Sequence, residues 1–136
     1  MARYLLDTNV LSEVRKRAPH PRVAAWFESA AAHELHVSVL VLGEIRQGIE
    51  RLRTRDPAQA RVFDDWLTRL ERDFADRLLS VTATVAQAWG RLNAPSALPA
   101  VDGLLAATAL VHGLTFVTRD VSRLAVSGVS LLDPWQ

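Results

Sequence analysis

Four acidic residues, far apart in the chain, are the side chains best suited to chemistry. Asp7 and Asp120 each follow a short apolar run, while Glu44 and Asp102 lie in stretches with helical spacing of apolar residues. Each alone could cap a helix, sit in a turn or be solvated. In one pocket the four carboxylates would repel one another, unless a hard cation such as Mg²⁺ or Mn²⁺ compensated their charge. The set therefore indicates carboxylate-held metal chemistry.

The chain lacks the residues that several other catalytic chemistries require. The chain has no cysteine, which excludes disulfides, thiolate nucleophiles and cysteine-based metal sites. Its one lysine, Lys16, stands between two arginines, so there is no Gly-Lys-Ser/Thr phosphate loop. The motifs Gly-x-Gly-x-x-Gly, Gly-x-Ser-x-Gly and His-Glu-x-x-His are also absent. Carboxylate chemistry is what remains.

Length and composition favour one globular domain. The chain has 136 residues, 49% apolar and 23% charged, so we expect a single domain over residues 1–136. A net charge of +1 provides no global positive field, and any nucleic-acid binding must depend on local patches. The N-terminus reaches a charge too early for a signal peptide, and the apolar region 104–117 is too short for a membrane span. We expect a soluble, cytoplasmic protein with no membrane partner.

Short strands alternating with helices are predicted along the chain. Apolar runs predict strands at 4–6, 35–37, 78–81, 115–117 and 129–132. Helical spacing predicts helices at 10 to about 17, 23–30, 39–53, 57–74, 84–92 and 101–111, with 94–99 as an exposed connection. The helix 101–111 is apolar almost all round, so we expect it at the centre. The pattern predicts an α/β fold, with a parallel sheet of four or five short strands covered by helices on both faces.

The predicted fold gives the four acids a common place. In an open parallel sheet, ligands bind beyond the carboxyl ends of the strands, where loops and helix N-termini meet. Asp7 ends the first predicted strand, Asp120 follows the fourth and Asp102 begins the central helix. Glu44 lies in the helix 39–53, offset from its apolar stripe. The four carboxylates can therefore converge at one edge of the sheet.

Four segments around these acids carry a further pattern. They are Leu5-Leu6-Asp7-Thr8-Asn9-Val10-Leu11-Ser12, Ser38-Val39-Leu40-Val41-Leu42-Gly43-Glu44-Ile45-Arg46-Gln47-Gly48-Ile49, Asp102-Gly103-Leu104-Leu105-Ala106-Ala107-Thr108-Ala109 and Phe116-Val117-Thr118-Arg119-Asp120. In this order and spacing they resemble the PIN domain, specifically the VapC toxins of bacterial toxin–antitoxin pairs. The ending Leu131-Leu132-Asp133-Pro134-Trp135 is similar to the FitB-like branch. The resemblance covers the whole chain.

The resemblance implies a PIN-like three-layer sandwich and a Mg²⁺- or Mn²⁺-dependent endoribonuclease that acts as a toxin. Asp7, Glu44 and Asp102 would be the core catalytic and metal-binding acids, and Asp120 the fourth. We expect Asp7 and Asp102 to bind the principal metal, while Glu44 and Asp120 complete its shell, position water or hold a second ion. Carboxylate-held ions can activate water and stabilise the departing oxyanion of a phosphodiester.

The resemblance also assigns supporting residues. Asn9, Ser38 and Thr118 fall where the family places supporting polar groups. Arg46 and Arg119 stand beside two of the acids and are candidates for contact with RNA phosphates, although a solvated surface role explains either one equally well.

The implied partners are an RNA substrate, a VapB-like antitoxin and a second copy of the chain in a homodimer. The antitoxin peptide would lie along a helical groove and bring a basic side chain to the acids. The sequence departs from the branch at one segment. Relatives often have Asn where this chain has Asp120, and Asp-Phe where it has Arg123-Leu124. A cation thus replaces an acid, which bears on a second metal position.

Three other functions differ from this one in the residues that they require. A phosphatase of the haloacid-dehalogenase type needs Asp-x-Asp after the first strand and a later lysine, whereas this chain has Asp7-Thr8-Asn9 and no lysine beyond Lys16. A phosphoryl-accepting receiver lacks the same lysine. A catalytically inactive PIN-type module that binds RNA or protein stays open as the alternative, and metal-dependent RNA cleavage distinguishes it from the nuclease.

Overall fold

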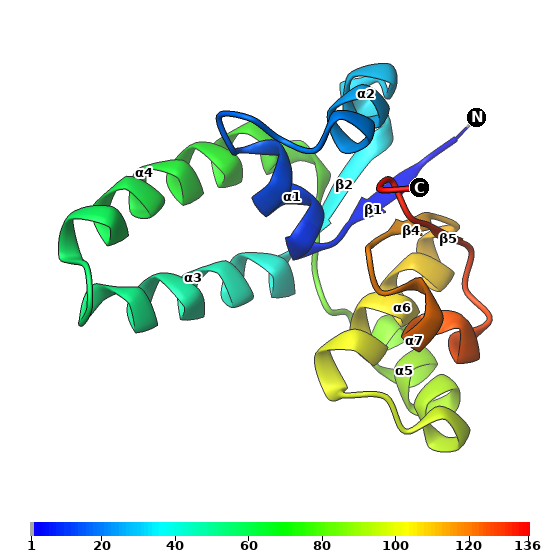
Figure 1. Cartoon of the computed structure of the whole chain (residues 1–136). Coiled ribbons are helices and arrows are strands. Elements are labelled where there is room, and N and C mark those ends of the chain that lie inside the picture. The colour runs from blue at the N-terminus through cyan, green and yellow to red at the C-terminus, as the bar shows by residue number, and fades with distance from the viewer. Residues whose placement is uncertain (1) are drawn as a thin grey trace.

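Five short parallel strands cross the middle of the protein in the order β3-β2-β1-β4-β5 (Figure 1). The structure is a computed structural model that describes residues 2–136. The strands are β1 (Tyr4–Leu6), β2 (Leu35–Ser38), β3 (Leu78–Leu79), β4 (Thr115–Val117) and β5 (Leu131–Leu132). In the centre of the sheet, Leu5 of β1 is in register with His36 of β2 and Phe116 of β4. The predicted parallel α/β fold is confirmed.

Seven α-helices connect and cover these strands. They are α1 (Thr8–Val14), α2 (Pro21–Ser29), α3 (Val39–Arg53), α4 (Pro57–Asp73), α5 (Ala83–Ser96), α6 (Ala100–His112) and α7 (Val121–Leu124) among the described residues. Single 3₁₀ turns occur at Ala32–Glu34, Ala75–Arg77 and Ala125–Ser127. Within residues 2–136, no helix combines the length and the apolar character that a membrane span requires.

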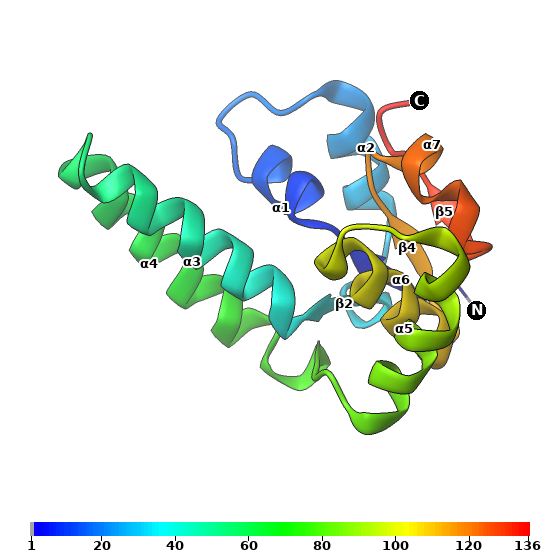
Figure 2. The ribbon, with the colours of Figure 1, turned by 90° about the horizontal axis from the view of Figure 1, so that it is seen from below.

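The direction of the chain across the sheet decides where the helices lie. From β1 to β3 the chain moves toward one edge, and after β3 it crosses back to β4 on the other side of β1. Parallel crossovers are right-handed, so this reversal puts the later helices on the opposite face from the earlier ones. Figure 1 shows α1 and α2 on one side of the sheet and α5 and α6 on the other. The α3–α4 pair projects away from the sheet in both ribbon views (Figures 1 and 2).

The core is built from the central strands together with α6, α1 and the α3–α4 pair. Leu5, Leu6, Phe116 and Val117 are almost fully buried. From α6, the buried residues are Gly103, Leu105, Ala106, Ala107, Thr108 and Ala109, so the nearly all-apolar helix is central, as predicted. Strands this short contribute few hydrogen bonds, and burial against the helices is their main stabilisation.

The pairing of β1 with β4 creates the point at which the strand order reverses. The chain leaves β1 toward β2 and returns beside β1 as β4. The backbone N–H of Asp7 donates to the carbonyl of Val117 at 3.0 Å. The residues that follow both strands therefore emerge side by side at the carboxyl edge of the sheet, the usual place for a ligand in open α/β folds.

Several predicted boundaries were wrong. Helix α1 ends at Val14 instead of near residue 17, and β3 and β5 have two residues each. Residues 94–96, predicted to be an exposed connection, extend α5 through Pro95. Pro95 has no N–H to donate to the carbonyl of Arg91, and the helix ends at Ser96, directly after it. Ala97 then ends the helix in a left-handed conformation (φ 52°). Helix α7 was not predicted.

Candidate active site

Asp7 is the buried member of the acid set. It ends β1, caps α1 and is only 9% exposed. Its Oδ1 accepts the backbone N–H of Thr8 at 2.8 Å, and its Oδ2 accepts the hydroxyl of Thr118 at 2.7 Å. Burial raises the pKa of Asp7 to about 6; the two hydrogen bonds lower it, and the charges of Glu44 and Asp120 raise it further. A carboxylate in such surroundings is stabilised in its charged form when a cation arrives.

Glu44 reaches this place from α3. The fully buried Ser38 ends β2, and its Oγ accepts the backbone N–H of Leu40 at 3.1 Å, which caps the helix that carries Glu44. Glu44 Oε1 accepts the hydroxyl of Thr8 at 2.8 Å. This bond joins α3 to the first residue of α1, next to Asp7. Ser38 therefore acts on the site by fixing the start of α3.

Asp120 and Asn9 meet on the other side of Asp7. The backbone N–H of Asp120 donates to Thr118 Oγ1 at 3.0 Å, so one buried hydroxyl links the loop after β4 to Asp7. Asn9 Nδ2 donates to Asp120 Oδ2 at 3.5 Å. Asn9 Oδ1 is buried without a hydrogen-bond partner in the described part of the chain. Such an oxygen is unusual in a folded protein and is available to a bound cation or water.

Asp102 faces Asp120, with the guanidinium of Arg123 between the two carboxylates. It is in the first turn of α6, and its side chain is 20% exposed. One terminal nitrogen of Arg123, in α7, lies 3.3 Å from Asp102 Oδ2 and 2.9 Å from Asp120 Oδ2. The structure thus brings Asp102 and Asp120 together around Arg123.

Asp102 is held in place by two residues, Asn93 and Gly103, that were not predicted to belong to the site. The amide of Asn93 donates to the carbonyl of Leu98 and accepts its N–H, both at 3.0 Å, and so shapes the turn from α5 into α6. Gly103 lets the two helices approach closely, because a Cβ there would lie 2.9 Å from Asn93 Oδ1 and from the Trp89 ring. Gly103 follows Asp102 directly in the sequence, which was a usable signal; nothing in the sequence singled out Asn93.

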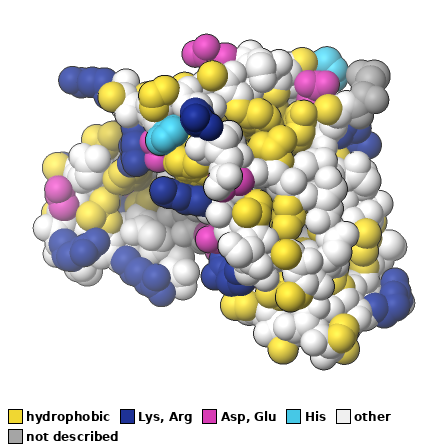
Figure 3. Space-filling view, turned by 45° about the vertical axis from the view of Figure 1, so that its right-hand side comes forward, with side chains coloured by type: hydrophobic (Ala, Val, Ile, Leu, Met, Phe, Trp, Pro, Cys, Tyr) yellow, Lys and Arg dark blue, Asp and Glu magenta, His cyan; other side chains and the backbone are white. Residues whose placement is uncertain are grey.

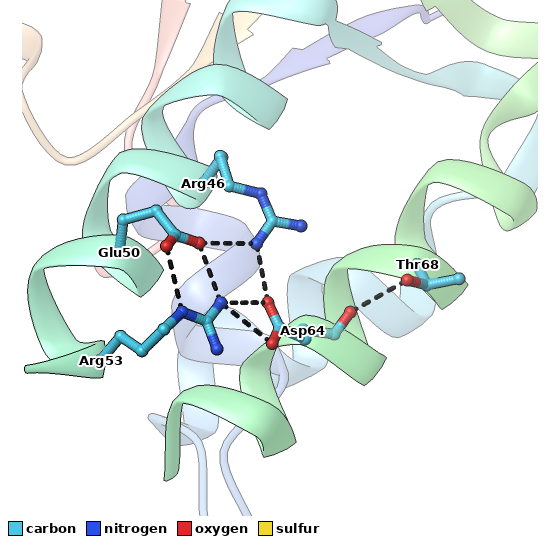
Figure 4. A network of polar contacts seen from close by, with 5 residues as sticks. All are labelled: Arg46, Glu50, Arg53, Asp64 and Thr68. Carbon is cyan, nitrogen blue, oxygen red and sulfur yellow. Dashed lines mark hydrogen bonds and ion pairs between the residues drawn. The ribbon is translucent and has the colours of Figure 1, made fainter. Parts of the chain in front are cut away.

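The two candidate RNA-binding arginines contact groups other than the four acids. Arg46 contacts Asp64 at 2.7 Å and Glu50 at 3.1 Å, in a network with Arg53 that joins α3 to α4 (Figure 4). The Arg119 guanidinium lies 4.9 Å from the centre of the Trp135 ring. Within the described residues, neither arginine forms an ion pair with the four predicted site acids.

A groove opens beside Glu44, between α1 and the α3–α4 pair. Its volume is about 270 Å³, and its lining includes Thr8, Glu44, Arg15, Phe63 and Trp66. The Arg15 guanidinium lies 4.1 Å from the centre of the Phe63 ring, a cation–π contact. Figure 3 shows acidic side chains at the margin of a hollow in the surface, with Lys or Arg side chains beside them. The groove is therefore an apolar surface that begins at the acids.

The donor set fits a hard divalent cation. Carboxylates and the unpartnered Asn9 Oδ1 are the oxygen ligands that Mg²⁺ and Mn²⁺ prefer. In residues 2–136, however, no three Asp, Glu or His side chains are close enough together to hold an ion as they lie. Asp7 is close to Glu44 and Asp120, and Asp102 is linked to Asp120 through Arg123. Binding an ion thus requires the exposed side chains to move.

Known proteins are similar to this chain in sequence and in fold. Residues 4–126 match the PIN domain family. The chain is 34% identical to the plasmid stability protein StbB of Pseudomonas syringae pv. tomato, over 97% of this chain and 98% of that one. It is 30% identical to the VapC ribonuclease Y4jK of Sinorhizobium fredii, over 97% of both.

A solved crystal structure is also similar to this chain. The crystal structure of FitAcB from Neisseria gonorrhoeae matches with a TM-score of 0.89 and 31% identity, over 98% of this chain and 99% of that one. The protein therefore belongs to the PIN-domain family. Within it, the chain is of the VapC toxin type, similar to FitB and StbB along its full length.

Proposed function

We propose that the chain is a Mg²⁺- or Mn²⁺-dependent endoribonuclease and the toxin of a toxin–antitoxin pair. The observation that carries the proposal is the buried Asp7 carboxylate, held at the junction of β1 and β4 with the charges of Glu44 and Asp120 beside it. Burial of a carboxylate among other acids is unfavourable for a protein unless the site serves a cation. The membership in the PIN-domain family and the relative named as a VapC ribonuclease support this reading.

The side chains divide the work of phosphodiester hydrolysis. We assign Asp7 and Asp102 to the principal metal, and Glu44 and Asp120 to its remaining shell. A bound Mg²⁺ or Mn²⁺ would supply an activated water and charge stabilisation at the phosphate. Thr118 orients Asp7, because its hydroxyl donates to Oδ2. Thr8 holds Glu44 Oε1, which leaves Oε2 to position a water or accept its proton.

Because the net charge of the chain is only +1, RNA has to be bound by individual basic side chains near the site. Arg119 is exposed next to Thr118, at the edge of the acid site, and we assign it a contact with an RNA phosphate. Arg46 lies two residues after Glu44 on α3, and its contact with a phosphate requires the guanidinium to leave Asp64 and Glu50. Both residues are thus proposed to bind the backbone and not the bases.

The proposed protein partners use the apolar groove and a second copy of the chain. An antitoxin peptide seated against Phe63 and Trp66 would run toward Glu44, from where one of its basic side chains can reach the acids. This assignment and the homodimer follow from the family resemblance, and we also propose a cytoplasmic location.

Cleavage of a defined RNA by the purified chain tests the proposal. We expect cleavage with Mn²⁺ or Mg²⁺, none with EDTA, and cleavage at least about a hundredfold slower by Asp7→Asn. Asp76→Asn is the matched control, because Asp76 is 80% exposed and lies outside the site. RNA that is bound but left intact by the wild-type chain would support the alternative, an inactive PIN-type binding module.

A further inference from the structure

Arg123 makes two ion pairs through a single nitrogen. That nitrogen lies 3.3 Å from Asp102 Oδ2 and 2.9 Å from Asp120 Oδ2. Asp120 Oδ2 also accepts the weaker bond from Asn9 Nδ2, at 3.5 Å. Of the ion-paired residues, Asp102 lies at the start of α6, Asp120 at the end of the loop after β4, and Arg123 in α7. The positive charge of Arg123 therefore stands where two acids assigned to the metal face each other.

We propose that Arg123 is an exchangeable internal cation, which neutralises Asp102 and Asp120 in the metal-free protein and is displaced when a divalent ion binds. The inference rests on the proposed metal-dependent function. Asp120 Oδ2 accepts an N–H of this guanidinium and so gives up a lone pair that the metal needs, and the same positive charge lies 3.3 Å from Asp102 Oδ2. The guanidinium and the metal thus compete for the same two Oδ2 atoms.

The surroundings of Arg123 allow this exchange. Its side chain is 50% exposed, and so is open to solvent on one side. Exposed ion pairs contribute little, because water and salt screen them. The next residue, Leu124, is 1% exposed and anchors α7 in the core. The long side chain can therefore turn into solvent while its backbone stays in place.

Two consequences distinguish this role from a purely structural ion pair. Removing the charge of Arg123 should strengthen metal binding, because the ion no longer displaces a competitor. It should also destabilise the metal-free protein, because Asp102 and Asp120 lose their counter-ion. An arginine that served only to hold α7 in place would show the second effect without the first.

The test is Mn²⁺ binding to the purified chain, measured without RNA by isothermal titration calorimetry. In Arg123→Met the side chain keeps its length and loses its charge, and we expect Mn²⁺ to bind roughly two- to tenfold more tightly, the range expected from exposed ion pairs. We also expect a lower melting temperature without metal and a larger rise when Mn²⁺ is added. Arg123→Lys should remain near the wild type, because it keeps a competing cation.

Two further variants make the result specific. Arg69→Met removes the charge of an exposed arginine on α4, outside the site, and should leave the Kd for Mn²⁺ unchanged. Asp7→Asn should weaken Mn²⁺ binding in both the wild-type and the Arg123→Met background, which ties the measured ion to this site.

Other results would overturn the inference. Equal or weaker Mn²⁺ binding by Arg123→Met, with a wild-type Kd that responds to Asp7→Asn, would refute the competition and leave the proposed function standing. If neither the wild type nor Arg123→Met binds Mn²⁺, or if Asp7→Asn leaves the Kd for Mn²⁺ unchanged, the inference and the proposed metal site are both refuted.

Discussion

Thr118 donates its hydroxyl hydrogen to Asp7 Oδ2 at 2.7 Å, across 111 residues of sequence. Both residues are buried at the carboxyl ends of adjacent strands. The same hydroxyl accepts the backbone N–H of Asp120 at 3.0 Å. One threonine therefore sets the direction of the buried carboxylate and the path of the loop that carries the fourth acid.

Replacing Thr118 by Val should remove both bonds with little change in volume. A buried carboxylate oxygen would lose its donor, so we expect the free energy of unfolding at pH 8 to fall by about 1–3 kcal/mol, and by less at pH 4 where Asp7 is protonated. Thr118→Ser, which keeps the hydroxyl, should recover most of the loss. The measurement is urea denaturation without metal.

Thr108→Val is the matched control for that substitution. Thr108 is equally buried, but its hydroxyl donates only to the carbonyl of Leu104 within its own helix. Its replacement should cost less than that of Thr118. Equal losses for the two valine variants would mean that the contact with Asp7 contributes nothing of its own.

The raised pKa of Asp7 predicts a specific pH dependence of stability. Its folded pKa is about 6, against an ordinary value of 3.8, so the folded state holds the proton more tightly than the unfolded state. The associated stability is complete below pH 3.8 and is lost as pH rises through 6, by up to about 3 kcal/mol at 1.36 kcal/mol per pKa unit. Asp7→Asn removes this titration.

The comparison uses urea denaturation from pH 4 to pH 8 in EDTA. The unfolding free energy of Asp7→Asn minus that of the wild type should increase over this range, so that the variant gains relative stability at pH 8 while losing activity. Taking the difference cancels the titration of groups that both chains share. A difference that stays constant with pH would show that Asp7 is not buried in its charged form.

The acids should not contribute equally to RNA cleavage. Asp7 is buried and assigned to the principal metal, so Asp7→Asn should slow cleavage at least about a hundredfold, or several kcal/mol at 1.4 kcal/mol per decade. Asp120 is 42% exposed, and an amide oxygen can partly replace its carboxylate, so Asp120→Asn should be mild. Asp120→Ala should fall between the two.

Cleavage rates of one defined RNA at saturating Mg²⁺ check this order. Because substitutions at both positions are Asp→Asn, they differ in location and not in chemistry. An Asp120→Asn defect as deep as that of Asp7→Asn would make Asp120 a primary ligand and contradict the assignment.

Gly103→Ala should destabilise the protein despite improving helix propensity. The new Cβ would lie 2.9 Å from Trp89 and Asn93, where packing leaves no room. Overpacking costs about 1–3 kcal/mol, against a propensity gain of about 1 kcal/mol. Gly90→Ala is the control, because a Cβ there meets nothing within 4 Å and the propensity gain should appear as added stability. Thermal unfolding of the two variants should shift in opposite directions.

The sequence predicted what depends on local pattern. Short apolar runs located the strands, and the three- and four-residue spacing from Val39 to Arg53 matched the bounds of α3. Ser38 and Asp56 stand directly before helical patterns, where cap residues are favoured, and each accepts a backbone N–H of the helix that follows. These features depend on neighbouring residues, so neighbouring residues reveal them.

The remaining features depend on residues that only the fold brings together. The pairing of Arg46 with Asp64 joins two helices, and nothing near Arg46 indicates it. The same is true of Arg123, which is close to Asp120 in sequence but meets Asp102 only because α6 and β4 are adjacent. The four acids were proposed from the sequence, but nothing in the sequence indicated that Asp102 is ion-paired with Arg123.

The position of β4 beside β1 also has a consequence during translation. The pocket of Asp7 is closed by the carbonyl of Val117 and the hydroxyl of Thr118, which leave the ribosome long after Asp7 does. A nascent or prematurely terminated chain that ends before β4 has most of the helices but cannot orient its first carboxylate. Synthesis thus delays the assembly of the acid site until nearly the whole chain has been made.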